Sequence, residues 1–261
     1  MAELAPVVAS QPVQATPFWY RHLFGIVAGV CALFVALTAL AMLLYPGGTV
    51  PIAATRGYQF FVNFLSDLGQ TRTQSGAWNY PSMLLFTTAM TTVGAGLGTF
   101  FVAFGKIVAT QAQAQWALRL NRAATAVGVA AAVCFVGVGA TPYNVLFPEH
   151  QTFVQWAFRL LLVAVILETA ALRLTSQIPA ALLWVNLAFV AILSGYLLLM
   201  VFGPSTRTLI GDEIHAVGQK LIVYVAVTTI FVQALLVRAH LPRHHYSRTQ
   251  MAHPQRLPRG Q

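Results

Sequence analysis

The sequence predicts an all-α, polytopic integral membrane protein with six transmembrane helices in one bundle and a short surface helix in its first outer loop. The first observation is composition, because hydrophobic residues make up 57% of the 261 residues and charged residues only 8%. The second is a mean hydropathy of +0.70. The third is a set of long apolar runs. Soluble domains carry about 25% charged residues, so a water-soluble globule is excluded.

Six apolar runs are each long enough to cross a membrane. A membrane helix needs about 20 such residues, because the hydrocarbon core is about 30 Å thick and each residue rises about 1.5 Å. The runs are continuous rather than alternating, which excludes a β-barrel. The predicted spans are Leu23–Tyr45, Ser82–Gly105, Ala123–Ala140, Phe153–Leu172, Ile178–Phe202 and Ala216–Val237.

The chain divides into a disordered N-terminal tail (1–17), a transmembrane domain (18–238) and a basic, disordered C-terminal tail (239–261). With the N-terminus inside, ten Lys or Arg residues lie on the cytoplasmic side and three on the outer side. This bias predicts a multi-pass protein of the cell membrane with both termini in the cytoplasm. The basic tail lies beside a membrane, so its expected partner is anionic inner-leaflet lipid and not nucleic acid.

The first outer loop contains an apolar segment whose residues recur at helical spacing. This pattern predicts a short helix on the outer surface, ended by Gly69. On such a helix Asp67 faces the bundle, whereas Ser66 points away from it. The apolar residues are Phe60, Phe61, Phe64, Leu65 and Leu68.

Small residues four apart lie in the first three spans, where they allow helix backbones to approach closely. We interpret them as packing contacts within one chain in preference to a dimer motif. They are Gly25 and Gly29, Gly94 and Gly98, and the series Ala124, Gly128 and Ala132.

Ionisable residues at depth are the candidates for function, because a charge in a membrane span must face protein or a water-filled cavity. Arg159 and Lys220 each lie about seven residues, or roughly 10 Å, below the outer end of a span. Four of the six acids also lie on this side, namely Asp67, Glu149, Asp212 and Glu213. The pattern predicts a polar pocket that opens outward, with acids and histidines at its mouth and two cations on its floor.

Three interpretations of this pocket remain open. In the first, Arg159 and Lys220 form structural ion pairs with Asp67 and Glu213. In the second, the two cations hold an anionic group such as a lipid phosphate. In the third, a metal ion activates water as in a membrane hydrolase. Its ligands would come from Asp67, His150, Asp212 and His215, although no HExxH-type spacing is present.

Three short motifs carry a family resemblance. The run Asn63–Gly69 (NFLSDLG) before the second span resembles the prokaryotic six-span membrane family catalogued as domain of unknown function 998. The stretches Phe147–His150 (FPEH) and Gly218–Leu221 (GQKL) are similar to further elements of that family. The chain is also loosely similar to the Frag1/DRAM/Sfk1 group. The resemblance implies a six-span bundle with a shared polar site and no established reaction.

We therefore expect a membrane protein that binds or handles a lipid or other amphiphile on its extracytoplasmic side, and we favour a non-enzymatic role. A metal-dependent hydrolase of lipids is the alternative, and a small transporter is a second one, with Glu168 as its candidate acid. No cofactor is expected, and membrane lipid is the expected partner. The predicted ligand-binding residues are Asn63, Ser66, Asp67, His150, Arg159, His215, Gln219 and Lys220.

Overall fold

The computed structural model describes residues 19–112, 114–175 and 178–241. Nearly all of both predicted tails therefore lies outside the described residues. Within these residues, six α-helices and one 3₁₀ helix follow one another. They are α1 (Trp19–Leu44), η1 (Leu65–Gly69), α2 (Tyr80–Gln111), α3 (Gln115–Ala140), α4 (Phe147–Arg173), α5 (Ala180–Phe202) and α6 (Leu209–His240).

Local sequence explains where several helices begin. Pro81 and Pro148 occupy the first turns of α2 and α4, where proline fixes a helical φ and its missing N–H costs nothing. Thr208 caps α6, because its side chain accepts a hydrogen bond from the backbone N–H of Gly211. α1 ends just before Tyr45 and Pro46, and a residue that precedes proline disfavours helical geometry.

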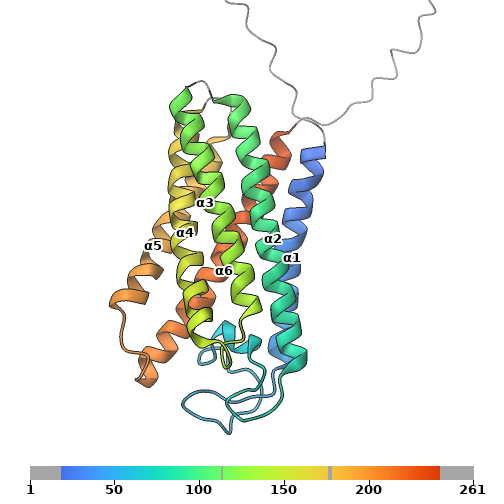
Figure 1. Cartoon of the computed structure of the whole chain (residues 1–261), viewed down its shortest axis with the longest axis vertical. Coiled ribbons are helices and arrows are strands. Elements are labelled where there is room, and N and C mark those ends of the chain that lie inside the picture. The colour runs from blue at the N-terminus through green and yellow to red at the C-terminus, as the bar shows by residue number, and fades with distance from the viewer. Residues whose placement is uncertain (1–18, 113, 176–177, 242–261) are drawn as a thin grey trace, which may run out of the picture.

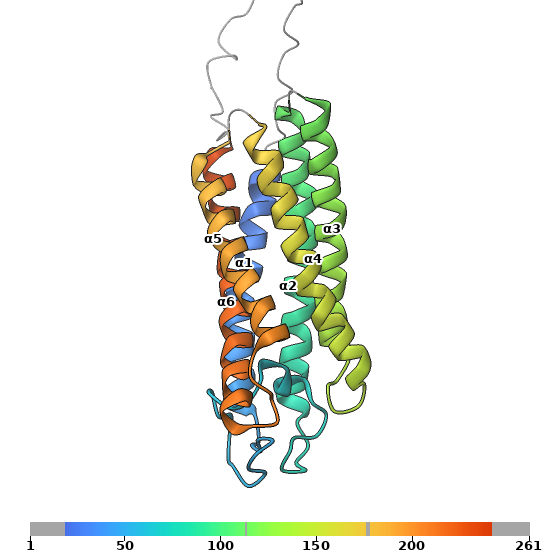
Figure 2. The same ribbon diagram turned by 90° about the vertical axis from the view of Figure 1, so that its left-hand side faces the viewer.

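The helices form one bundle in which each packs against the next along the chain, and α6 returns to pack against α1 (Figures 1 and 2). Residues 45–79 form a long segment that covers one end of the bundle, which we call the loop end. The start of α1 and the end of α6 lie together at the opposite end, which we call the terminal end (Figure 1).

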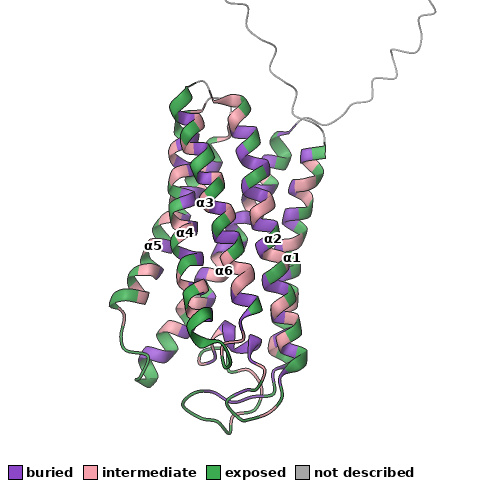
Figure 3. Cartoon of the chain, viewed as in Figure 1, coloured by how far each residue is buried: buried purple, intermediate pink, exposed green. Residues whose placement is uncertain are grey.

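All six helices are long and apolar enough to cross a membrane. Their outward faces carry large hydrophobic side chains, including Leu43, Trp184 and Phe202, which are 81%, 69% and 79% exposed. Exposed residues recur along the helices of the bundle from one end to the other (Figure 3). Soluble monomers rarely present so large an apolar surface. The predicted six-helix membrane fold is therefore confirmed, and each helix overlaps its predicted span.

The first outer loop differs in detail from its prediction. A short helix is present, but it is the single 3₁₀ turn η1 and not a surface helix, because all five of its residues are buried. Phe60 and Phe61 lie before it and are exposed. Asp67 faces the bundle as predicted, whereas the prediction that Ser66 points away is wrong, since Ser66 is 8% exposed. A 3₁₀ helix has three residues per turn, so the angles assigned for an α-helix do not hold.

Small residues bring α2 and α3 together within the chain. A Cβ added at Gly94 would lie 2.7 Å from Val136 Cγ2, and one added at Gly128 would overlap the ring of Phe101. The predicted intramolecular packing is therefore confirmed for these two glycines. Gly29 behaves differently, because an added Cβ there would meet nothing within 4 Å.

Candidate functional site

The Asp67 carboxylate is the centre of a buried hydrogen-bond network at the loop end. Its Oδ2 accepts hydrogen bonds from Asn63 Nδ2 at 3.0 Å and from the Phe64 backbone N–H at 2.9 Å. Its Oδ1 accepts one from Gln70 Nε2 at 3.1 Å. Both oxygens are thus engaged, and their role is to hold η1 in the end of the bundle.

Asn63 connects this network to Lys220 and to the loop. The Lys220 ammonium donates to the Asn63 backbone carbonyl, which also accepts from the Tyr58 hydroxyl at 3.0 Å. The Asn63 side chain donates to Gly48 O at 3.0 Å and accepts from the Gln59 N–H at 2.9 Å. The Asn63 side chain therefore connects Gly48, Gln59 and Asp67, and its backbone carbonyl connects the loop to α6.

The electrostatics of Asp67 follow from its burial. Loss of hydration raises the pKa of its carboxyl from 3.8 to about 6. The hydrogen bonds from Asn63 and Phe64 and the charge of Lys220 lower the pKa and offset part of this effect, whereas Asp212 raises it. Asp67 therefore changes its charge near neutral pH.

This shift gives a testable pH dependence of stability. The folded protein binds the Asp67 proton more tightly than the unfolded chain does. The stability that this contributes is fully present below pH 3.8 and is lost as the pH rises through about 6. We expect the wild type to lose on the order of 2–3 kcal/mol relative to Asp67→Asn between about pH 4 and about pH 7. Unfolding in detergent measures this difference, and parallel pH curves for the two proteins would contradict the assignment.

A cavity of about 400 Å³ opens at the loop end among α4, α5 and α6. η1 and the α3–α4 and α5–α6 connections complete its wall. It contains five of the eight predicted ligand-binding residues, namely Ser66, Asp67, His150, His215 and Gln219. The remaining lining residues are Val50, Phe64, Tyr143, Phe147, Gln151, Val154, Gln155, Tyr196, Met200, Thr206 and Asp212.

The His150 side chain lines this cavity, and one of its ring nitrogens has no partner among the described residues. The side chain is 3% exposed, and its Nδ1 lies 2.8 Å from the Thr141 carbonyl oxygen. A carbonyl only accepts, so Nδ1 carries the proton, and Nε2 of the neutral ring is an acceptor. This Nε2 is buried and has no hydrogen-bond partner among the described residues. Buried polar atoms are nearly always paired, so this nitrogen is available to a ligand once the ring or its neighbours shift to give it accessible surface.

Other groups in the wall are also mainly acceptors. The Asp212 carboxylate makes no hydrogen bond to another described residue. His215 Nε2 lies 3.0 Å from the Pro204 carbonyl, which leaves Nδ1 as the acceptor of the neutral ring. Gln219 is the exception, because its Oε1 accepts from the Leu65 N–H at 2.8 Å and its Nε2 is left as a donor. The cavity is therefore suited to a group that donates hydrogen bonds.

The predicted floor of two cations is wrong. Arg159 is exposed, and its Nη1 donates to Gln155 Oε1 at 2.9 Å. Lys220 is 2% exposed, but it lies behind η1 and does not line the cavity. Equal depth on two helices does not fix the direction in which each side chain points. Asn63, the remaining predicted residue, is buried in the loop network and is likewise absent from the cavity wall.

The proposed structural ion pairs are not formed either. In residues 19–112, 114–175 and 178–241, no ion pair joins Arg159 or Lys220 to Asp67 or Glu213. Glu213 shares a helix face with Lys220 by spacing, yet Glu213 is exposed whereas Lys220 is buried.

The alternative metal ligands are not gathered into one site. Within the described residues, no group of three or more His, Cys, Asp or Glu side chains is placed to share a metal ion. Asp67 has both oxygens engaged, and His150 and His215 each use one ring nitrogen for a backbone carbonyl. The geometry of these residues thus gives no support to metal-assisted hydrolysis.

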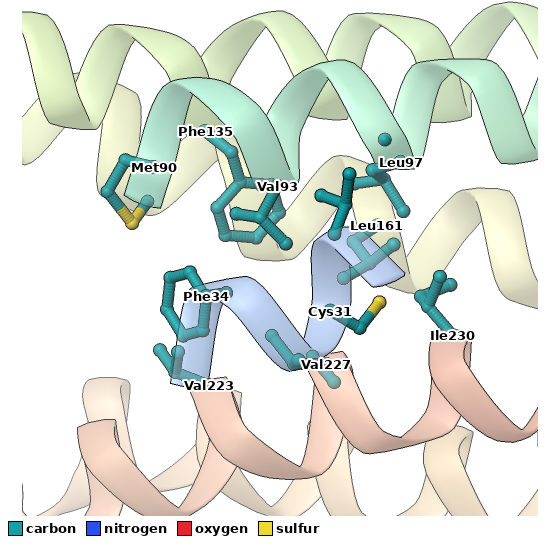
Figure 4. Close-up of a pocket in the computed structure, with 13 residues that line it drawn as sticks. Cys31, Phe34, Met90, Val93, Leu97, Phe135, Leu161, Val223, Val227 and Ile230 are labelled. Atoms are coloured by element: carbon teal, nitrogen blue, oxygen red, sulfur yellow. The ribbon is translucent and has the colours of Figure 1, made fainter. Parts of the chain in front are cut away.

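Smaller apolar cavities continue from the outer cavity toward the middle of the bundle. The first, of about 20 Å³, shares Ser66, Val154 and Gln219 with the outer cavity. The second, of about 40 Å³, shares Met90, Phe135 and Val223 with the first. Figure 4 shows this central cavity, with Phe, Val, Leu and Ile side chains directed into it from several helices.

Sequence reasoning missed the residues that position the site because most of them are uncharged. Thr141 fixes the His150 ring, Gln70 donates to the Asp67 carboxylate, and Asn79 donates to the Leu68 carbonyl of η1. Isolated amides and hydroxyls beside apolar runs are the signal that would have found them. Comparison of the chain with protein-family models, with curated proteins and with solved structures finds no match.

Proposed function

We propose that this membrane protein binds a single-chain amphiphile whose polar head enters the outer cavity and whose chain follows the smaller apolar cavities. The head carries hydrogen-bond donors, such as hydroxyl or ammonium groups. The observation that carries the proposal is a cavity of about 400 Å³ lined by His150, whose buried Nε2 has no partner among the described residues. Ligand pockets commonly have volumes of about 300–1,000 Å³ with a few placed polar groups.

The chemistry of the wall favours a neutral or cationic head over a phosphate. Asp67 and Asp212 contribute negative charge when ionised, and His150 and His215 contribute acceptor nitrogens. The two residues expected to hold an anion do not line the cavity, since Arg159 is exposed and Lys220 is occupied by Asn63. An anionic head would thus face acceptors without a cation.

The chain of the amphiphile would extend toward the bundle interior, where two apolar cavities of about 20 and about 40 Å³ must widen to take it. The central cavity is lined almost wholly by apolar side chains (Figure 4). Voids in a core forfeit packing contacts, so an alkyl chain that fills them stabilises the folded state. Val223 lies at the junction of the two inner cavities and is the residue best placed to block them.

Thermal unfolding in a neutral detergent tests the proposal with three probes that share one alkyl chain: laurylamine, monolaurin and laurate. We expect laurylamine or monolaurin to raise the Tm, by about 5–10 °C near saturation, whereas laurate does not. His150→Leu and Asp212→Asn should each reduce the shift at least severalfold. Val223→Phe should reduce it for these probes while a short-chain amine or alcohol still binds.

His240→Leu is the matched control, because His240 is an exposed histidine near the other end of α6. It should respond to the probes as the wild type does. Equal shifts by all three probes in the wild type and in His150→Leu would refute the proposal. So would a laurate effect that is lost in Arg159→Leu, which would restore the anion-binding interpretation.

Two further expectations from the sequence, the orientation in the membrane and the family resemblance, are part of this proposal. We infer that the loop end faces away from the cytoplasm, because the arginine distribution predicts it. The resemblance to the domain of unknown function 998 family is part of the proposal, since its NFLSDLG run forms the buried network that closes the cavity. A binding role accounts for this arrangement without a catalytic group.

A further inference from the structure

A second polar cluster lies in the other half of the bundle, away from the outer cavity. It consists of Glu168 on α4, Asn186 on α5 and Gln233 on α6, which are 4%, 0% and 2% exposed. Each residue lies five to seven positions from the terminal end of its helix, or roughly 8–10 Å along it. Nothing in the proposed function uses these three side chains.

Hydrogen bonds join the three residues in series across three helices. Asn186 Nδ2 donates to Glu168 Oε1 at 3.3 Å, and Gln233 Nε2 donates to Asn186 Oδ1. Asn186 is the only polar amide in the buried stripe of α5, whose other members are Leu182, Phe189, Leu193 and Tyr196. The stripe therefore directs Asn186 at its two partners.

The cluster lacks one positive charge. A carboxylate removed from water is very costly unless a cation neutralises it. Two amides already suffice for hydrogen bonds between helices, so a glutamine at position 168 would serve a purely structural role at lower cost. The cluster also contains an unpaired acceptor, because Gln233 Oε1 is buried and has no hydrogen-bond partner in the part of the chain that the structure describes.

No side chain supplies that charge in the described ranges 19–112, 114–175 and 178–241. Glu168 makes no ion pair there, and its one polar side-chain contact is Asn186. The basic residues of this half lie near the ends of their helices. Arg21 on α1 is half-buried and donates to the Arg238 and Leu241 carbonyls, whereas the others are exposed. The exposed ones are His22 on α1, Lys106 on α2, Arg119 and Arg122 on α3, Arg173 on α4, and Arg238 and His240 on α6. The other titratable side chain on α5 is Tyr196, two helical turns or more toward the loop end.

We propose that Glu168, Asn186 and Gln233 bind one exchangeable monovalent cation, either a proton or an alkali metal ion. A single cation neutralises the Glu168 carboxylate, and the unpaired Gln233 Oε1 is a further acceptor in the same hydrogen-bonded series. A divalent ion is disfavoured, because one carboxylate would leave a net positive charge in the same apolar surroundings. Ionisable groups inside membrane bundles commonly mark such ion sites.

The test measures the Tm of the purified full chain in detergent with choline chloride, NaCl or KCl at equal ionic strength, between about pH 5 and about pH 9. All proteins carry Asp67→Asn, so that Asp67 does not titrate. Glu168→Gln keeps the shape and the hydrogen bonds of the site but removes its charge. A second variant, Gln233→Met, keeps the volume and removes the unpaired oxygen.

If an alkali ion binds, NaCl or KCl raises the Tm of the protein with Glu168 by about 5–10 °C over choline near saturation, and Glu168→Gln abolishes the increase. If a proton binds, the salts act alike, and the Tm with Glu168 falls relative to Glu168→Gln as the pH rises. Gln233→Met weakens either response. The same pH and salt dependence with and without Glu168 would overturn the proposal, whatever amphiphile the outer cavity takes.

Discussion

Replacement of Asn63 by alanine is expected to lower the free energy of unfolding by about 3–4 kcal/mol. The change removes three hydrogen bonds of a side chain that is 1% exposed. It leaves the Gln59 N–H without its acceptor, and it deprives the buried Asp67 carboxylate of one of its three donors. Unfolding in mixed dodecylmaltoside–SDS micelles measures the loss.

Asn144→Ala is the matched control at the same end of the molecule. Asn144 also makes two side-chain hydrogen bonds, which join the α3–α4 connection to Thr71, but it is exposed. Water replaces those partners, so we expect a loss below about 1 kcal/mol. Equal losses in the two variants would mean that burial does not determine the strength of the loop network.

The sequence predicted the helices well because the bilayer imposes one simple requirement on each span. Apolar runs of about 20 residues have few alternatives to a membrane helix. The helix ends were less accurate, and the structure extends the last predicted span from Val237 to His240 and begins it at Leu209 instead of Ala216. Polar residues continue the helix beyond the hydrocarbon layer, where hydropathy no longer reports on them.

The candidate site was predicted only in part, because spacing along a helix gives depth but not the packing neighbour. His150, His215 and Gln219 were placed correctly at the loop end and share the cavity. Arg159 and Lys220 lie in the predicted helices, but their surroundings differ from the predicted ones. Which face of a helix meets the cavity depends on the order in which six helices pack, and no local pattern contains that order.

The cluster of Glu168, Asn186 and Gln233 was also predicted only in part. Glu168 was recognised as the one acid there, but Asn186 and Gln233 were not associated with it. Uncharged amides carry no strong signal in hydropathy, although a buried amide in a membrane span needs a partner as surely as a charge does. A search for every polar side chain within an apolar run would have selected all three residues.

Close packing of α2 on α3 gives the second large effect, and Gly128→Ala is expected to lower the free energy of unfolding by about 3 kcal/mol. A methyl group at this position would overlap the ring of Phe101, which is 2% exposed and cannot turn aside. The helices must then separate, and they lose contacts along their shared face. The same unfolding titration in mixed micelles measures the change.

Gly29→Ala introduces the same methyl group into α1, where it meets nothing within 4 Å. There the higher helix propensity of alanine should leave stability unchanged or slightly increased. Equal free energies of unfolding for Gly128→Ala and Gly29→Ala would contradict this prediction. They would mean that α2 and α3 are not packed closely enough at Gly128 to exclude a methyl group. Because α3 also packs against α4, which carries both His150 and Glu168, a loosened contact should weaken both proposed sites together.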